Sequence, residues 1–258
     1  MKKLTICALL VLFAVLRAQA QKSDPQPSTE VDASKPTNLY TQVNTLMEFT
    51  KLKNGTRLYG FRGNLQYSFN PDNLILAEIP LLYNNQTTAF GLSDIRVRYF
   101  GVVKRVQTPE KFSVVAPFID VTLPTGSFKD GLGSSSLVIG AGVVYGFAAA
   151  KNISMFPGLS VVHVTKPSAS TIPESLKFSS TGFSTQVNMS ISFTKTWFLF
   201  VNPIATVLHG NNNWKTTWTG EFNLNHMVVP NKLKANLGYF PNFTYHSNTI
   251  RAGATFYL

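Results

Sequence analysis

The residues of this sequence best suited to chemistry are charged ones, and they are expected to share one face of predicted strands. Arginine pairs bidentately with carboxylates, and fixed charges inside a pore select solutes by sign and size. Two interpretations stand side by side: a charged constriction that favours anions or carboxylates, and a network of ion pairs that fills and stiffens an interior. The candidates, six basic and four acidic, are Arg62, Glu78, Asp94, Arg96, Arg98, Asp120, Lys215, Glu221, Lys234 and Arg251.

Strands must position these side chains, and alternation of residue type predicts the strands. In residues 183–194, mostly apolar odd-numbered positions alternate without a break with polar even-numbered positions. Side chains on a strand point to opposite faces with period 2, so such a strand is apolar on one face only. The pattern recurs along the chain, with the charges almost wholly on the polar face. Residues 196–208 are less clean, because Asn202 shares its parity with Phe198 and Phe200.

Twelve strands follow from this pattern, and the count is even, as in bacterial outer-membrane barrels. Connections after even-numbered strands are mostly short, whereas those after odd-numbered strands tend to be longer and polar, which predicts short periplasmic turns and longer extracellular loops. The sequence therefore predicts an all-β chain with a single antiparallel transmembrane β-barrel. The expected strands are 42–51, 57–69, 73–83, 91–103, 111–123, 135–148, 153–165, 177–194, 196–208, 214–228, 232–241 and 248–258.

The apolar face of these strands is expected to contact lipid. An Arg or Lys facing lipid at the midplane costs about 2–4 kcal/mol, so one-sided placement of charge is informative. Aromatic residues near both predicted strand ends suit two membrane interfaces. These residues are Tyr59, Phe61, Trp214 and Trp218 on the loop side, and Tyr67, Phe69, Tyr99 and Trp197 on the turn side. The alternative is a soluble calycin-like barrel, which closes at about eight strands around a small ligand and needs no aromatic belts.

The N-terminus has the features of a secretory signal over residues 1–20. Lys2 and Lys3 precede an apolar run of 13 residues, and Ala18-Gln19-Ala20 forms a small-residue cleavage site. The run is shorter than the roughly 20 residues of a spanning helix. The single cysteine, Cys7, lies inside it, so the mature chain has no thiol chemistry. We expect a disordered periplasmic leader over 21–40 and the barrel over 41–258.

Charge and motifs exclude several other classes. Without Lys2, Lys3 and Arg17, the 23 basic residues become 20 against 12 acidic ones, a formal net charge of +8. These charges are scattered rather than clustered, so no nucleic-acid partner is expected. No serine lies in a G-x-S-x-G motif, and the histidines and carboxylates lack metal-ligand spacing. We therefore expect no catalytic residue, metal or cofactor, and keep a membrane-embedded hydrolase only as a minor alternative.

A glycine-rich loop follows the fifth predicted strand, over residues 124–136. Glycine adopts backbone conformations closed to other residues, so the loop is able to fold into the mouth of the barrel. A mobile surface loop is the equal alternative. The candidate residues of this loop are Pro124, Gly126, Gly131 and Gly133.

Two motifs carry a family resemblance. Gly91-Leu92-Ser93-Asp94 with Arg96-Val97-Arg98-Tyr99 resembles a "GLGD" strand, and residues 123–126 with 131–136 resemble an "LPTG … LGSGS" loop. Both belong to the outer-membrane transporter family named for the meta-pathway of phenol degradation. Ser93 and Ser135 stand where that family has glycine, which affects loop details. The resemblance spans residues 91–136 and implies an outer-membrane channel for small solutes, aromatic or hydrophobic ones among them, without a catalytic residue.

The sequence thus predicts a passive outer-membrane channel for small solutes with a charged lumen. Its expected partners are outer-membrane lipid, a small-molecule solute and the barrel-assembly machinery during insertion. The main alternative is a non-conducting structural or adhesive barrel whose ion pairs fill its own lumen.

Overall fold

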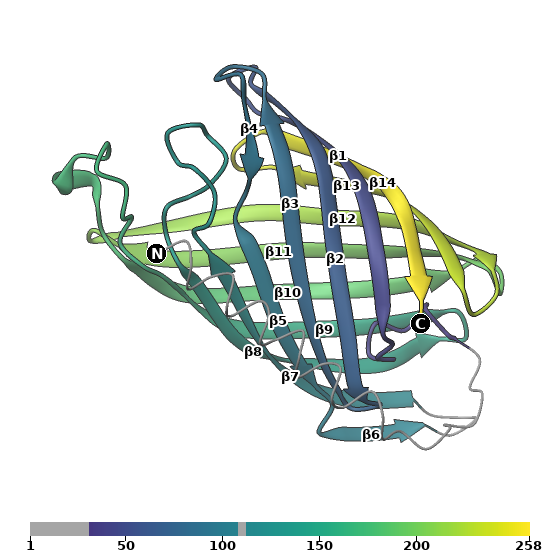
Figure 1. The fold of residues 1–258 in the computed structure, drawn as a ribbon. Coiled ribbons are helices and arrows are strands. Elements are labelled where there is room, and N and C mark those ends of the chain that lie inside the picture. The colour runs from purple at the N-terminus through teal and green to yellow at the C-terminus, as the bar shows by residue number, and fades with distance from the viewer. Residues whose placement is uncertain (1–30, 108–111) are drawn as a thin grey trace. The chain divides into compact units, whose positions relative to one another are not determined.

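The protein folds into one closed antiparallel β-barrel, seen in a computed structural model that describes residues 31–107 and 112–258 (Figure 1). The barrel belongs to one compact unit, Asp32–Leu258. The strands are β1 (Gln42–Lys51), β2 (Arg57–Asn70), β3 (Asn73–Asn84), β4 (Ala89–Leu92), β5 (Ile95–Gly101), β6 (Lys104–Gln107), β7 (Phe112–Leu123), β8 (Val138–Ala150), β9 (Ile153–Val164), β10 (Ser180–Ser192), β11 (Trp197–Gly210), β12 (Asn213–Val229), β13 (Leu233–Asn242) and β14 (Ser247–Tyr257). Closure comes from β1, which pairs with both β2 and β14.

The described strands form twelve positions around the wall. Strands β4 and β5 both pair with β3, and β5 and β6 both pair with β7, so these three strands follow one another along a single position. Each of the twelve predicted strands corresponds to one position. The predicted fold, a single antiparallel barrel of about twelve strands, is confirmed.

Alternation assigns the two faces of the wall. On β2, Phe61 is 54% exposed on the outside, whereas the Arg62 side chain is 12% exposed inside. On β14, Phe256 is 49% exposed and the neighbouring Thr255 only 1%. Period 2 therefore sorts apolar residues outward and polar residues inward, as the sequence predicts.

The two ends of the barrel differ. At one end, here the turn end, short connections join β2 to β3, β8 to β9, and β12 to β13, and β14 ends. At the other, here the loop end, the longest connections are 124–137 and 165–179. The second of these contains the 3₁₀ helix η1 (Glu174–Leu176), where hydrogen bonds from Lys166 and Lys177 lower the pKa of Glu174 to about 2. No helix in residues 31–107 or 112–258 is long and apolar enough to cross a membrane.

An apolar cluster fills part of the interior toward the turn end. Its members come mainly from β3, β7, β8 and β9, and Phe156 and Val114 are each only 1% exposed. Outside this cluster, residues 196–208 also place both apolar and polar side chains inside. Phe198 is 3% exposed and Asn202 5% exposed, which is why the pattern of that strand is mixed. The cluster consists of Leu39, Leu74, Val102, Phe112, Val114, Ala116, Phe118, Val144 and Phe156, with Leu76 and Phe100 packed against it.

Residues 32–41, here the N-terminal segment, extend across the opening at the turn end. Lys35 lies 5.4 Å from the Phe112 ring of β7, whereas Tyr40 packs against Tyr257 of β14, on a distant part of the wall. Arg105 donates a 3.1 Å hydrogen bond to the carbonyl of Thr37, which is 2% exposed. The segment is therefore built into the barrel.

This order differs from the disordered leader expected over 21–40. Backbone carbonyls of the segment find donors on the barrel wall, since Arg105 donates to the Thr37 carbonyl and the Gln66 amide donates to the Tyr40 carbonyl over 2.9 Å. Polar side chains bond within the segment, as Asn38 does when it donates to the Asp32 carbonyl over 3.2 Å. Residues 21–30 and the predicted signal peptide, 1–20, lie outside the described residues.

Candidate functional site: a charged belt inside the barrel

Seven charged side chains form a continuous belt along the inner wall, from β14 through β1, β2, β3 and β5 to β7. Their charges alternate in sign from one strand to the next. The ion pairs are Arg251–Glu48 at 2.9 Å, Glu48–Arg62 at 2.7 Å, Arg62–Glu78 at 3.2 Å, Glu78–Arg96 at 3.5 Å, Arg96–Asp120, and Asp120–Arg98 at 2.5 Å. We call these seven residues the charged belt.

Strand register creates the belt. Arg251 is directly opposite Glu48, Arg96 is opposite Glu78, and Asp120 is opposite Arg98. Directly opposite residues on antiparallel strands bring their side chains within reach of each other, which favours opposite charges. Arg62 reaches diagonally and joins Glu48 to Glu78.

The belt presents mainly its positive groups to the lumen. The carboxylate side chains are covered, with Glu48 4% exposed and Glu78 and Asp120 each 15% exposed. Arg96 and Arg98 are 34% and 30% exposed. The belt also has four arginines against three carboxylates, so its accessible surface is cationic.

A cavity of about 270 Å³ adjoins Arg96 and Arg98 in the lumen. Gly140 of β8 is directly opposite Asp120, and its missing side chain leaves space beside the arginines. The other side of the cavity comes from β8 to β11 and mixes apolar with hydroxyl and amide groups. It includes Val138, Ser160, Val162, Ser184, Gln186 and Ile204.

Three further predicted lumen residues lie outside the belt. Glu221 of β12 accepts a 3.1 Å hydrogen bond from Asn202, and it lies near enough to Arg96 and Arg98 to interact with them electrostatically. Lys215 is exposed at the loop end, 4.9 Å from the Tyr245 ring. Lys234 lies near the turn end, 5.9 Å from each of the Phe198 and Tyr257 rings. The structure thus brings six of the predicted lumen residues together and leaves these three apart.

Asp94 has a different role from the one predicted, since it holds the loop 124–137. Its Oδ1 accepts a 3.0 Å hydrogen bond from the Gly126 amide, and its Oδ2 accepts bonds from the Ser134 amide and hydroxyl at 2.7 and 2.8 Å. The Thr125 hydroxyl donates to the Ser93 carbonyl over 2.8 Å. These bonds fix both ends of the loop to the junction between β4 and β5.

The loop glycines allow this close packing. A Cβ on Gly126 would lie 2.4 Å from the Leu132 carbonyl oxygen, and a Cβ on Gly133 would lie 2.5 Å from Asp94. Gly131 has φ +67°, a left-handed conformation that favours glycine. Leu132 is 4% exposed, and its side chain lies against Gly91 of β4. The loop that starts at Pro124 is therefore a packed element at the loop end.

Sequence reasoning missed Glu48, the most buried member of the belt. It is the acidic residue on the polar face of the first predicted strand, and the closed barrel places that strand beside the last one, which carries Arg251. Pairing the first predicted strand with the last one in the sequence analysis would have identified the contact between Glu48 and Arg251. The apolar cluster and the N-terminal segment were missed as well.

In the part of the chain that the structure describes, no group of three or more His, Cys, Asp or Glu side chains is arranged for a metal ion. His163 bonds with the Thr181 hydroxyl at 2.7 Å, and His226 stacks on Trp197 with ring centroids 4.2 Å apart. Neither contact joins a histidine to a serine.

Comparison with known proteins finds the fold but no family. No family model matches the chain, and no curated protein matches it in sequence. Among solved structures, the COG4313 outer membrane channel from Pseudomonas putida F1 is 10% identical, with a TM-score of 0.62 over 92% of this chain and 100% of that one. The NanC porin is 10% identical, with a TM-score of 0.59 over 84% and 100%. The KdgM porin bound to oligogalacturonate is 11% identical, with a TM-score of 0.54 over 83% and 98%. The family resemblance of residues 91–136 stays a prediction.

Replacing Glu48 with alanine should lower the free energy of unfolding by about 3–5 kcal/mol, because Arg62 and Arg251 would keep their buried charges without their shared carboxylate. Urea unfolding of the barrel refolded in detergent measures this. Glu174→Ala is the control, since the exposed side chain of Glu174 lies in a loop and its loss should lower the free energy of unfolding far less than the loss of Glu48. Equal losses in the two variants would contradict the structural role of the belt.

Replacing Asp94 with alanine should release the loop 124–137 and speed trypsin cleavage after Lys129 on the order of tenfold, since each hydrogen bond to a charged group contributes about 1.5–3 kcal/mol. Time-resolved mass spectrometry of the digest measures the rate. Asp72→Ala, which removes an exposed carboxylate at the turn end, serves as the control. An unchanged rate in Asp94→Ala would show that other contacts hold the loop.

Proposed function

We propose that this protein is an outer-membrane channel that passively admits small solutes and prefers anions. The observation that carries the proposal is the charged belt, whose carboxylates are covered while Arg96 and Arg98 face the lumen. In this proposal the turn end is periplasmic and the loop end extracellular, and the barrel reaches the membrane through the barrel-assembly machinery.

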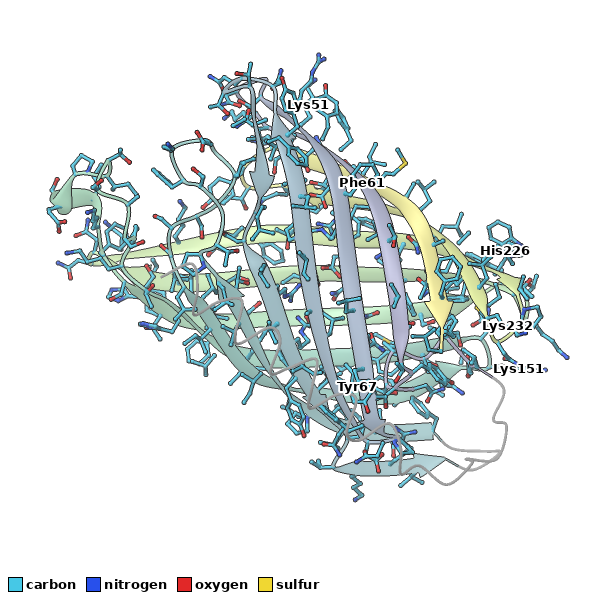
Figure 2. All side chains as sticks on the ribbon, in the orientation of Figure 1. Lys51, Phe61, Tyr67, Lys151, His226 and Lys232 are labelled. Atoms are coloured by element: carbon cyan, nitrogen blue, oxygen red, sulfur yellow. The ribbon has the colours of Figure 1, made fainter. Side chains whose placement is uncertain are left out.

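The outer wall supports a membrane location. Contiguous exposed apolar surface on a barrel needs a partner, and lipid is the partner that covers a whole wall. Outward residues such as Phe61 and Ile119 are more than half exposed. Figure 2 shows Phe61 on the outside, while Lys51 lies at the loop end and Lys151 and Lys232 at the turn end. Lysines at both ends and apolar residues between them suit a bilayer.

Trp214 and Trp218 near the loop end, and Trp197 near the turn end, add amphipathic rings where two interfaces would lie. The solved channels and porins of similar fold are consistent with this location. Oligogalacturonate is bound by KdgM and is not assigned to this chain.

The contents of the lumen favour a second candidate, a non-conducting barrel. The N-terminal segment crosses the turn end, and the apolar cluster fills the interior beside it. In this candidate the cluster and the N-terminal segment close the lumen toward the turn end, and the barrel would be structural or adhesive. The channel instead needs a path past these groups.

Single-channel recording in a planar bilayer with a salt gradient tests the channel. The wild type should show discrete steps with anion preference, and Arg98→Gln should lower the anion-to-cation permeability ratio about fivefold, since a unit charge 4 Å from an ion contributes about 1 kcal/mol even in water. Arg98→Gln is mild, because Asp120 keeps Arg96 as its partner. Arg57→Gln, which changes an exposed arginine at the loop end, is the matched control. An equal effect of both would contradict selectivity at the belt.

Replacing residues 32–40 with a Gly/Ser segment of equal length should raise the open probability several-fold, because it removes the contacts of Leu39 and Tyr40 while keeping chain length. The measurement is again single-channel current, on protein whose heat-sensitive gel mobility shows that it is folded. Silence from both the folded wild type and this variant would favour the non-conducting barrel.

A further inference from the structure

The cavity beside the charged belt has two chemically different sides. Arg96 and Arg98 form a cationic side, whereas Val138, Val162 and Ile204 add apolar surface on the other strands that line it. Its volume of about 270 Å³ is just below the range of roughly 300–1,000 Å³ typical of drug-sized ligands. The cavity therefore suits a small molecule with one polar and one apolar end.

Arg96 and Arg98 on the cationic side have more N–H donors than Asp120 has acceptor positions for them. Arg98 directs both Nε and Nη2 to a single oxygen of Asp120, at 3.1 and 2.5 Å, and Arg96 binds the same carboxylate. Two guanidinium groups thus share one carboxylate, although each has five N–H donors. In the part of the chain that the structure describes, Nη1 of Arg98 has no protein acceptor, and Arg98 is 30% exposed. A carboxylate is the group that matches such a donor set bidentately.

The charges around the cavity disfavour a ligand with two negative charges. The belt alone has four arginines and three carboxylates, a net charge of +1, so its own attraction for anions is modest. Glu221 adds a negative charge from the opposite side of the lumen, close enough to act on both Arg96 and Arg98. A second carboxylate on the ligand would be repelled by Glu221. One negative charge is therefore favoured over two.

The remaining surface favours an apolar body. The Phe118 ring lies 5.3 Å from the Arg98 guanidinium and lines the same cavity, so a ligand held by Arg98 would contact this ring. Gly140 provides the space, because a Cβ there would meet no atom closer than 3.8 Å. A purely polar solute would leave Phe118, Val162 and Ile204 without an apolar partner.

We propose that this cavity is a binding site for a small monocarboxylate with an apolar body, with the carboxylate on Arg98 and Arg96 and the body against Phe118 and Ile204. The proposal rests on the proposed function and names the class of solute that the channel would select.

Calorimetric titration of the folded barrel in detergent tests binding without requiring conduction. Benzoate is the probe, benzyl alcohol is a neutral analogue of similar shape, acetate lacks the apolar body, and terephthalate carries a second charge. Benzoate should bind at least tenfold more tightly than each of the other three. Arg98→Gln should weaken benzoate binding at least tenfold.

Gly140→Leu tests the cavity more directly than Arg98→Gln does, because the leucine side chain fills the cavity and leaves every charge in place. It should weaken benzoate binding at least tenfold. Gly63→Leu adds the same side chain to the outer wall, where a Cβ would meet no atom closer than 4.0 Å, and should leave binding unchanged. Equal binding of benzoate and benzyl alcohol, or benzoate binding that Gly140→Leu does not change, would overturn the proposal.

The bilayer recordings separate this site from the channel function. Anion-selective current without saturable benzoate binding would overturn the site and keep the channel. Saturable binding that depends on Gly140 and Arg98, in a barrel that never conducts, would keep the site and overturn the channel.

Discussion

The pairing of β1 with β14 is the contact on which the rest of the molecule depends. It closes the sheet, so that the backbone groups of the first and last strands find partners and the wall acquires an inside. It also places Glu48 directly opposite Arg251, which starts the charged belt at the seam itself. Closure at twelve positions makes a lumen wider than that of filled eight-stranded barrels, so the interior needs contents of its own.

The interior of the barrel is apolar toward one end and charged farther along. Toward the turn end, apolar side chains pack together with the N-terminal segment, whereas farther along the wall the inner surface is charged. Buried charges carry a large desolvation cost, which is offset here because each carboxylate of the belt contacts two arginines. The arrangement also explains the exposed cationic surface. Carboxylates placed between arginines are covered, and the guanidinium groups of Arg96 and Arg98 face the lumen.

The sequence predicted the wall much better than its contents. Alternation is a local property of each strand, so residues such as Phe61 and Arg62 reveal their faces without knowledge of the neighbours. Which charges meet depends on register between strands, and Glu48 joins Arg251 across 203 positions of the sequence. Asp94 shares the polar face with Arg96 and Arg98, and only the packing of residues 124–137 reveals that it binds a loop. The segment 32–40 looked disordered because its composition is polar, and its partners lie on distant strands.

The contacts that hold the N-terminal segment at the turn end distinguish the channel from the non-conducting barrel. Leu39 is the member of the apolar cluster that the N-terminal segment supplies, whereas the other members belong to the barrel wall or its turns. The remaining described contacts of the segment are mostly hydrogen bonds, such as those to the Thr37 and Tyr40 carbonyls, which water can replace at small net cost. Displacing the segment would uncover Leu39 and separate Tyr40 from Tyr257, but it would break no strand pairing of the wall. The channel therefore needs these contacts to open, whereas the non-conducting barrel needs only that they persist.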